Sequence, residues 1–192
     1  LPADLAVQLA ALGGLVWNMY GPTETTIWSS VARIADAAAP ITIGRPIANT
    51  AWHIVDSANR LAPLGVTGEL LIGGCGLANG YFGRADLTEK AFVSLDIGAG
   101  HTERLYRTGD VGKRLTDGSL LLLGRRDNQV KLRGFRIELG DIEAVIGKAE
   151  GVRQCAAVVA KTKSGEAQLV AYVVPRDPSR PPADSELSAE AK

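Results

Sequence analysis

The stretch GRRDNQVKLRGFRIELGDIE, Gly124 to Glu143, combines a turn, a basic strand and the start of an amphipathic helix in one short run. Glycines flank the strand, and an acidic helix start follows directly after Ile137. Alternation along a strand places Lys131 and Arg133 on one face. That face could bind phosphate or a partner's carboxylates, or it could be a solvated edge strand protected by charge. The stretch is expected to bring positive charge to an anion and then to change the chain's direction.

The residues after Asp127 read as a small unit of their own. The strand NQVKLR is followed by the helix LGDIEAVIGKAE and by the strands VRQCAAVVAK and AQLVAYVV. Helical spacing places four apolar side chains on one face, against which the apolar strands can pack: Ile142, Val145, Ile146 and Ala149. The pattern predicts an incomplete β-α-β-β domain over residues 127–192, with a hinge at Asp127.

Residues 1–126 read as a larger, β-rich unit. A helix is expected over Pro2–Leu12, and the strands LVWNMY and TTIWSSVARI are expected on either side of a Gly-Pro turn. Short strands punctuated by Gly and Pro follow from Ile41 to Gly74, and RLYRTGDVGKRL with SLLLLGR predicts a hairpin. The expected fold class is therefore α/β, with a barrel-like β unit followed by the small domain.

Composition limits the possible partners. The chain has 192 residues, 46% of them hydrophobic, and 21 basic residues balance 21 acidic ones. No overall field therefore favours nucleic acid or an anionic membrane, and an anion site must be local. No apolar run approaches the roughly 20 residues of a membrane span. We expect a cytoplasmic protein, and the start at Leu1 without a Met suggests a piece of something longer.

The cysteines do not indicate a metal site. Cys75 and Cys155 lie far apart, and only His53 and His101 add further soft ligands. The paired short spacings of a zinc site are therefore missing from the sequence. Both cysteines are expected to be buried free thiols.

The run NMYGPTETT, Asn18 to Thr26, ends a strand in a turn that exposes Thr23, Glu24 and Thr25 together. Such a turn can offer backbone N–H groups and hydroxyls to a phosphate, with a carboxylate beside them for Mg²⁺. An ordinary polar β-turn has the same sequence signature. Physics alone leaves both interpretations open.

The run YRTGD, Tyr106 to Asp110, delivers an aspartate at a glycine turn. An ionised carboxylate accepts two hydrogen bonds at once, which suits a vicinal diol such as ribose. A hairpin aspartate that caps its own turn is the alternative.

The run ELLIGGCGLANGYFG is similar to a dinucleotide-binding loop, because a strand precedes Gly74-Cys75-Gly76. The third glycine arrives one residue late, at Gly80, where Asn79 holds the required position. Gly80 and Gly83 would also weaken the helix that the motif needs. A nucleotide-free loop is therefore favoured over a Rossmann oxidoreductase, which stays as the rival class of enzyme.

Taken together and in this order, NMYGPTETT, GELLIGGCGLANGY, YRTGD and GRRDNQVKLRGFRIELGDIE resemble the adenylation domains of nonribosomal peptide synthetases, in the superfamily of acyl-CoA synthetases and luciferases. The resemblance extends to about Pro175. It implies the adenylate-forming fold, with residues 1–126 as the C-terminal part of the large adenylation core. Residues 127–192 are then an incomplete C-terminal lid domain.

The resemblance implies a nucleotide site around the Gly-Pro turn. Tyr20 packs by the adenine, Gly21 adjoins the nucleotide, and Thr23 contacts its α-phosphate. Glu24 holds Mg²⁺, so that Thr23 and Glu24 act in catalysis. ATP or AMP and Mg²⁺ are the implied cofactors.

The resemblance implies further roles along the chain. Asp110 binds the ribose hydroxyls with help from Arg125, and Asp127 is the hinge. Lys131 is the third catalytic residue and approaches the adenylate or stabilises one pose of the lid. Gly134 lies beside the channel for phosphopantetheine, which a peptidyl carrier domain bears.

The amino-acid pocket is implied at Met19, Ile27 and Trp28. Their bulk and lack of charge favour a small or apolar amino acid. The family's Ser/Thr/Gly-rich phosphate loop, its aspartate for the substrate amino group and its Pro-x-x-x-x-Gly-Lys lysine are not found in the sequence. The chain alone is therefore expected to be inactive in substrate-dependent pyrophosphate exchange.

Two alternatives remain beside a part of an amino-acid-activating domain. The chain could belong to an acyl- or aryl-CoA synthetase, because YRTGD and the hinge run occur widely in that superfamily. It could also be a non-catalytic docking module for a carrier domain or a small MbtH-like activator. The runs RGFRIELGDIE and TETTIW favour the peptide synthetase.

Overall fold

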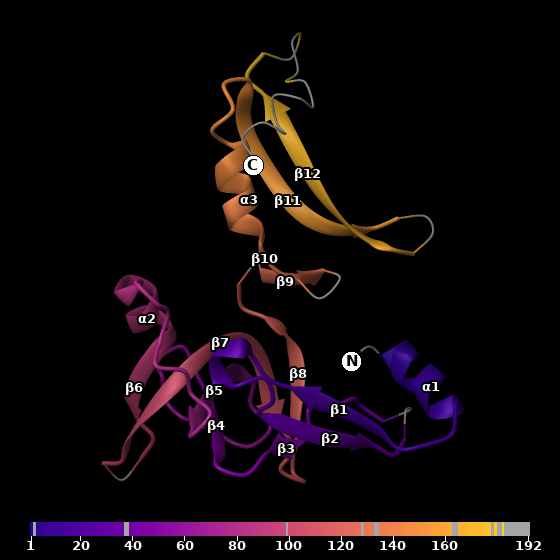
Figure 1. The fold of residues 1–192 in the computed structure, drawn as a ribbon, viewed down its shortest axis with the longest axis vertical. Coiled ribbons are helices and arrows are strands. Elements are labelled where there is room, and N and C mark those ends of the chain that lie inside the picture. Colours follow the sequence, from indigo (N-terminus) through magenta and orange to yellow (C-terminus); the bar gives the residue numbers. More distant parts are fainter. Residues whose placement is uncertain are drawn as a thin grey trace. The chain divides into compact units, whose positions relative to one another are not determined.

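The computed structural model describes residues 1, 3–36, 39–98, 100–127, 129–132, 135–162, 165–177, 179 and 182. The chain divides into two compact units, Leu1–Arg126 and Asp127–Lys192 (Figure 1). No helix among the described residues combines the length and the hydropathy needed to cross a bilayer.

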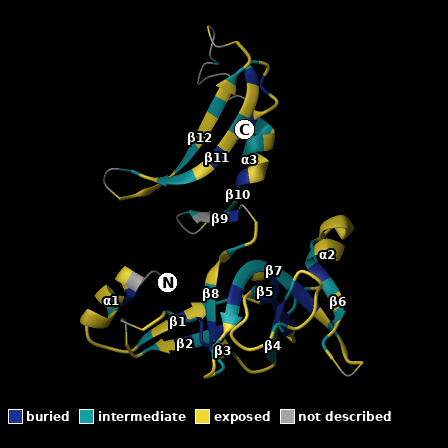
Figure 2. Cartoon of the chain, turned by 180° about the vertical axis from the view of Figure 1, so that it is seen from behind, coloured by how far each residue is buried: buried dark blue, intermediate teal, exposed yellow. Residues whose placement is uncertain are grey.

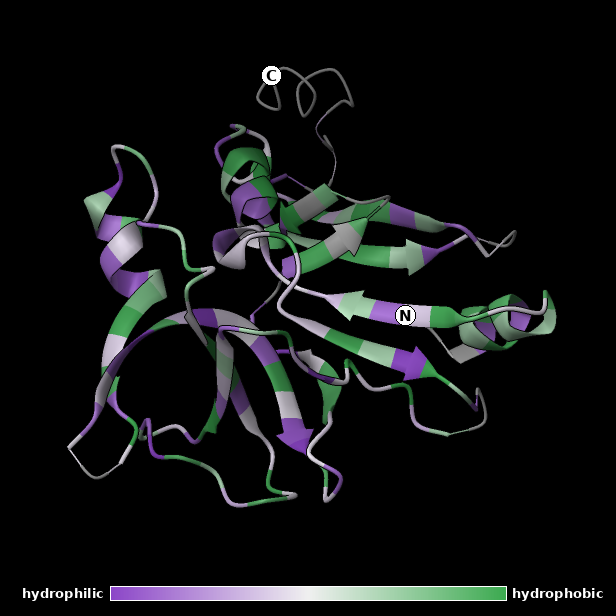
Figure 3. Cartoon of the chain, turned by 60° about the horizontal axis from the view of Figure 1, so that its bottom comes forward, coloured by the Kyte–Doolittle hydropathy of each residue, from purple (hydrophilic) through white to green (hydrophobic). Residues whose placement is uncertain are grey.

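The first unit begins with a helix and a small antiparallel sheet of strand order β1-β2-β3. Hydrophobic residues make up much of the helix (Figure 3), and Leu5 and Val7 on it are 40% and 52% exposed. A short 3₁₀ turn, η1, separates the first two strands. The elements are α1 (Ala3–Ala11), β1 (Val16–Tyr20), η1 (Thr23–Thr25), β2 (Ser30–Ile34) and β3 (Arg45–Pro46).

A five-stranded antiparallel sheet makes up the rest of this unit. The long strand β7 pairs with β5 along one edge, while its first half pairs with β6 and its second half with β8 along the other. Bulges interrupt both the β5 and the β8 pairing, and β7 curves strongly (Figure 1). The elements are β4 (Thr50–Val55), β5 (Gly68–Gly74), α2 (Ala85–Ala91), β6 (Phe92–Asp96), β7 (Thr102–Arg114) and β8 (Leu120–Arg125).

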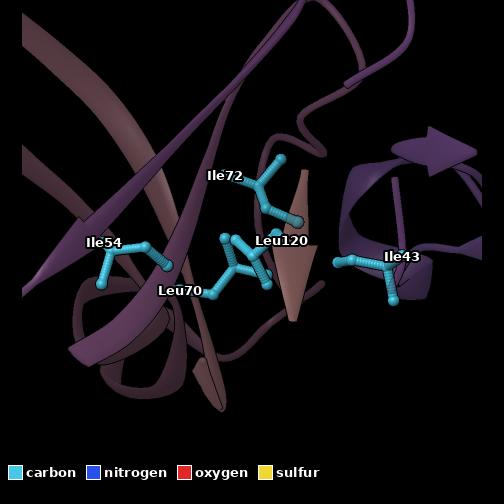
Figure 4. Close-up of a cluster of buried hydrophobic side chains, with 5 residues drawn as sticks. All are labelled: Ile43, Ile54, Leu70, Ile72 and Leu120. Atoms are coloured by element: carbon cyan, nitrogen blue, oxygen red, sulfur yellow. The ribbon is translucent and has the colours of Figure 1, made fainter. Parts of the chain in front are cut away.

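The core of this unit lies on both faces of β5. Leu70 and Ile72 point into one cluster of buried side chains (Figure 4), and Leu71 between them packs into a second cluster. Figure 2 shows the resulting buried positions on β5. Because alternate residues of a strand face opposite sides, a central strand covered on both faces needs a continuous apolar run. The run Leu70-Leu71-Ile72 is that pattern, and each buried Leu or Ile stabilises the fold by about 1.5–3 kcal/mol.

The second unit contains two antiparallel hairpins and a helix. Strands β9 and β10 pair with Lys131 opposite Arg136, and β11 pairs with β12 along most of their lengths. Helix α3 packs on β11, and Ile146 of the helix, Ala149 of the following turn and Val152 of β11 form one buried cluster. The elements are β9 (Gln129–Leu132), β10 (Phe135–Glu138), α3 (Leu139–Ile146), β11 (Val152–Lys161) and β12 (Ala167–Pro175).

Two details of this unit differ from the sequence-based expectation. The segment FRIE forms the additional strand β10, so the order is β-β-α-β-β instead of β-α-β-β. The helix ends at Ile146 and not at Glu150, because Gly147 caps it with its N–H on the Glu143 carbonyl. The following residues turn directly into β11.

The cysteines also differ from expectation. Cys75 is exposed in the loop after β5, whereas Cys155 on β11 is partly buried. Both are free thiols. The predicted burial of Cys75 is therefore wrong, because the strand ends at Gly74 and the chain turns away from the sheet there.

Candidate functional site

Three of the expected nucleotide residues meet where the last residues of β1 and β8 reach the second half of β7. Asp110 on β7 and Arg125 on β8 are register partners in the hairpin, and Tyr20 is the last residue of β1. The Arg125 Nη1 lies 2.9 Å from Asp110 Oδ1, and the Tyr20 hydroxyl donates to Asp110 Oδ2. The structure thus brings together Tyr20 and Asp110, which are 90 residues apart in the sequence.

The Asp110 carboxylate is held by a cation and a neutral donor in a largely buried setting. The side chains of Arg125 and Asp110 are 20% and 15% exposed. Burial, and after it the negative charge of Asp110, raises the pKa of the Tyr20 phenol. The phenol therefore stays protonated near neutral pH and donates to the carboxylate. A carboxylate has about four lone-pair sites, so this one can still accept ligand hydroxyls.

Thr108 orients Asp110 and was missed by the sequence-based reasoning. The Asp110 N–H donates to Thr108 Oγ1 at 2.9 Å, and that hydroxyl donates to the Leu70 carbonyl on β5 at 2.8 Å. Gly109 between them has a φ of 73°, which favours glycine. The threonine two positions before the aspartate in YRTGD is the signal that could have revealed this turn.

The 3₁₀ turn η1 presents Thr23 and Glu24 differently. Thr23 is exposed, whereas Glu24 is 8% exposed. The Tyr81 hydroxyl donates to Glu24 Oε1 at 2.6 Å. Burial, followed by the hydrogen bond to Glu24, raises the pKa of Tyr81, so the phenol remains a donor at neutral pH. The sequence-based reasoning assigned no role to Tyr81.

The backbone after η1 is strained and does not continue as a strand. Thr26 and Ile27 have φ values of 61° and 69°, a region that β-branched residues rarely occupy. A Cβ at Gly21 would lie 2.7 Å from the Ser29 nitrogen, so the two segments approach as only glycine allows. The strand expected over TTIWSSVARI therefore begins only at Ser30. Strained backbone of this kind often marks functional sites.

The three residues expected to line an amino-acid pocket are exposed. Met19, Ile27 and Trp28 have exposed fractions of 40%, 68% and 54%. Met19 lies on β1 and the other two precede β2. The described residues thus place all three at the surface of the first unit, near the end of β1 that carries Tyr20.

Two surface pockets of the first unit are lined by residues other than the Asp110 cluster. One of about 480 Å³ is lined by residues of β3, β4, the end of β7 and the turn that follows it, including Arg45, Trp52 and Arg114. A second of about 170 Å³ adjoins Leu61 and Leu64. Neither pocket is lined by Tyr20, Asp110 or Arg125, so pocket volume does not identify the candidate nucleotide site.

The second unit holds the remaining expected residues. Asp127 is exposed, and its Oδ1 accepts the Gln129 N–H at 3.2 Å. Gln129 is buried and donates through Nε2 to Glu138. Lys131 lies on β9, and Gly134 lies outside the described residues.

The rival dinucleotide-binding interpretation is wrong on the fold. The glycines after β5 lead into a turn and a loop, and the next helix starts only at Ala85. The strand pairs among the described residues are all antiparallel, whereas the dinucleotide fold needs a parallel β-α-β unit. In the part of the chain that the structure describes, His, Cys, Asp and Glu form no group of three or more that could hold a metal ion.

Comparison with known proteins connects this geometry to a family. Residues 1–82 match the family model described as AMP-binding enzyme. A dimodular nonribosomal peptide synthase from Bacillus subtilis (strain 168) is 47% identical over 175 residues, which cover 91% of this chain and 7% of that protein.

Solved structures agree with that match. A four-domain holo nonribosomal peptide synthetase bound to AMP and glycine is 48% identical, with a TM-score of 0.62 over 92% of this chain and 13% of that one. A nonribosomal peptide synthetase protein containing adenylation and PCP domains is 32% identical, with a TM-score of 0.81 over 94% of this chain and 37% of that one. Over most of its length the chain therefore resembles part of an adenylation domain of a nonribosomal peptide synthetase, and its first 82 residues match the AMP-binding enzyme family.

Proposed function

We propose that this chain supplies the ribose- and phosphate-binding part of an amino-acid-activating adenylation domain. Such a domain joins an amino acid to ATP as aminoacyl-AMP and passes the aminoacyl group to a carrier-bound phosphopantetheine thiol. The observation that carries the proposal is the Tyr20–Asp110–Arg125 cluster, a largely buried carboxylate on β7 held by the last residues of β1 and β8. A relative bound to AMP and glycine supports the nucleotide and substrate class.

The cluster suits a ribose ring. The Asp110 carboxylate can accept hydrogen bonds from both hydroxyls of a vicinal diol, while Arg125 holds its orientation and charge. Tyr20, whose hydroxyl donates to that carboxylate, is the residue that would pack by the adenine. Orientation of the nucleotide by fixed groups is the contribution expected of these residues.

The η1 turn suits the phosphates. Gly21 permits the close backbone approach that η1 needs, and the exposed Thr23 hydroxyl is available to the α-phosphate. A single buried carboxylate, Glu24, fits an Mg²⁺ ion that is held mainly by substrate phosphates and water instead of a protein cage. Bound there, the ion would neutralise charge on the phosphates during attack by the substrate carboxylate on the α-phosphorus and departure of pyrophosphate.

The second unit is proposed as the lid. Asp127 stands at the boundary between the two units and is assigned as the hinge. The family resemblance suggests that Lys131 acts at the adenylate and that Gly134 belongs to the pantetheine channel. The thiol reaction needs different groups at the same carbonyl, which a rotating lid can supply. A relative that joins adenylation and PCP domains supports a peptidyl carrier domain as partner.

The proposal also covers the substrate class, an additional partner and the cellular compartment. The uncharged side chains of Met19, Ile27 and Trp28 favour a small or apolar amino acid. A small MbtH-like protein is proposed as an additional partner. ATP is a cytoplasmic metabolite, so we place the reaction in the cytoplasm.

Calorimetric titration of the purified chain with AMP tests the nucleotide site. Asp110→Asn should weaken AMP binding at least tenfold, because an amide accepts fewer hydrogen bonds than a carboxylate. Asp86→Asn, at an exposed carboxylate on α2, is the matched control and should leave binding unchanged. Equal AMP binding by the Asp110 variant and the unmodified chain would sink the proposal.

A second assay separates the alternatives. The chain is joined to the upstream segment of a homologous adenylation domain, and pyrophosphate exchange is measured with amino acids and with fatty or aryl acids. Exchange that depends on amino acids supports the proposal, whereas exchange that depends only on the other acids indicates an acyl- or aryl-CoA synthetase. Binding of a carrier domain without any nucleotide binding would indicate a docking module.

A further inference from the structure

We infer that Tyr81 and Arg104 are positioning residues that hold the Glu24 carboxylate where it can engage a nucleotide-bound Mg²⁺. The inference rests on the proposed nucleotide function and extends it to the loop between β5 and α2. That loop contains Cys75 to Arg84 and contributes no residue to the nucleotide site implied by the family resemblance. Its contacts with η1 nevertheless control Glu24.

The first contact is the hydrogen bond to the carboxylate itself. Glu24 is 8% exposed, and Tyr81 donates to its Oε1 at 2.6 Å. Hydrogen bonds to charged groups are shorter and stronger than neutral ones. A buried carboxylate held in this way loses rotamer freedom, so its direction is set before any ligand arrives.

Tyr81 is itself fixed by its neighbours. Its N–H donates to Thr88 Oγ1 at 2.9 Å, and that hydroxyl lies 2.9 Å from the Arg84 carbonyl it donates to. Its ring packs edge-on against Phe92 with centroids 5.9 Å apart. At Gly80 a Cβ would lie 2.8 Å from the Thr88 hydroxyl oxygen, so glycine allows this close packing.

Arg104 ties the rest of the loop to β7. Its two terminal nitrogens donate to the carbonyls of Ala78 and Asn79, each at 2.9 Å. Its guanidinium also lies 4.6 Å from the centroid of the Phe92 ring. The planar fork of arginine makes this double contact, which lysine cannot reproduce.

The fixed loop is joined directly to the main chain of Glu24. The Ala78 N–H donates to the Glu24 carbonyl at 2.8 Å, and Thr26 Oγ1 donates to the Gly76 carbonyl at 2.8 Å. Arg104 therefore fixes the backbone of Glu24 through Ala78, and Tyr81 fixes its carboxylate. Both ends of one residue are positioned by a single loop.

The experiment uses calorimetry on the purified chain. It measures the affinity for AMP in the absence of metal, and it measures the affinity for ATP both with Mg²⁺ and with EDTA. The ratio of the two ATP affinities is the gain that Mg²⁺ brings. In Tyr81→Phe the gain in ATP affinity that Mg²⁺ brings should fall about tenfold, the usual size of a lost hydrogen bond to a charged group. The AMP affinity, which depends on the Asp110 cluster, should stay within about twofold. Arg104→Lys should show the same pattern to a smaller degree.

Tyr172→Phe is the matched control, because Tyr172 on β12 is 62% exposed and loses the same hydroxyl. It should change neither affinity. Glu24→Gln should remove the Mg²⁺ gain, and adding Tyr81→Phe to it should cause no further loss. The unmodified chain, Tyr81→Phe, Glu24→Gln and the double variant form a double-mutant cycle. Urea unfolding of these four chains gives a second readout, in which the effects of the two substitutions on the free energy of unfolding should not be additive.

The outcomes are distinct. A Tyr81→Phe chain that keeps the full Mg²⁺ gain, or one that loses AMP affinity to the same extent, overturns the positioning role. An unmodified chain that binds AMP but gains nothing from Mg²⁺ overturns the inference and leaves the ribose site intact. An unmodified chain that binds no AMP overturns the proposed function and the inference with it.

Discussion

Asp110 and Arg125 are register partners in the β7–β8 hairpin, and the guanidinium of Arg125 holds the carboxylate of Asp110 at 2.9 Å. Their pairing depends on a bulge between Val111 and Gly112, which shifts the register of β8 along β7. The sheet therefore determines not only that the two residues meet but also that their charged groups emerge at the end of β8. Tyr20 reaches the same carboxylate from a different sheet.

Removal of the Arg125 guanidinium should weaken nucleotide binding. Arg125→Ala leaves a carboxylate that is 15% exposed without its cation, and we expect AMP affinity to fall about tenfold or more. Arg125→Lys keeps the charge and should recover part of the loss. Arg60→Ala, at an exposed ion pair, is the control. Calorimetry that finds Arg125→Ala equal to this control would contradict the role of Arg125.

Thr108 should act through Asp110. Thr108→Val keeps the shape of this buried residue but removes the hydroxyl that receives the Asp110 N–H and binds the Leu70 carbonyl. We expect a loss of about 1–3 kcal/mol in the free energy of unfolding and a parallel loss of AMP affinity. Thr108→Ser retains the hydroxyl and should restore both. Denaturant unfolding and AMP titration of both Thr108 variants check this prediction. A serine variant that is as impaired as the valine variant would refute the hydrogen-bond explanation.

The alkaline stability of the first unit should depend on Tyr20. Burial and the charge of Asp110 raise the pKa of this phenol in the folded chain, whereas it is about 10 in the unfolded chain. The contribution of the protonated Tyr20 phenol to the free energy of unfolding is therefore fully present below pH 10. It is lost as the pH rises further, by up to about 1.4 kcal/mol per pH unit. Urea unfolding from pH 8 to 11 should show a smaller decline in Tyr20→Phe. An unchanged slope would argue against the Tyr20–Asp110 contact, and Tyr172→Phe serves as the reference.

Gly21 should tolerate no side chain. A Cβ there would lie 2.7 Å from the Ser29 nitrogen and 2.8 Å from the Trp28 Cα, and both neighbours are backbone atoms that cannot rotate away. We expect Gly21→Ala to lower the free energy of unfolding by about 1–3 kcal/mol. Gly140→Ala in α3 meets nothing within 4 Å and should be neutral or stabilising by up to about 1 kcal/mol. Thermal unfolding of both variants tests the contrast.

Local pattern was enough for elements whose apolar residues follow a simple period. The apolar run of β5, the hairpin of β7 with β8, and the strands β11 and β12 all lie where the sequence predicts them. Their apolar residues recur regularly enough along the sequence to identify each segment as a strand. The adenylate-forming fold was likewise accessible from the order of the motifs.

The failures occur where long-range contacts override local preference. Thr26 and Ile27 have β-forming side chains, yet the approach of Gly21 and the bond from Thr26 to the Gly76 carbonyl hold them at positive φ. Strand β10 was missed because its four residues, FRIE, are too short to show a period by themselves.

By itself the sequence determined the family that the chain resembles, the order of its motifs and the identity of Tyr20, Glu24 and Asp110 as candidates, because these depend on residue type and spacing. Only the tertiary structure decided their partners. Tyr81 meets Glu24 across 57 residues, and Thr108 reaches Leu70 across 38. Such hydrogen bonds depend on strand register and on the path of a loop, and both are set by packing of the whole unit instead of by any local pattern.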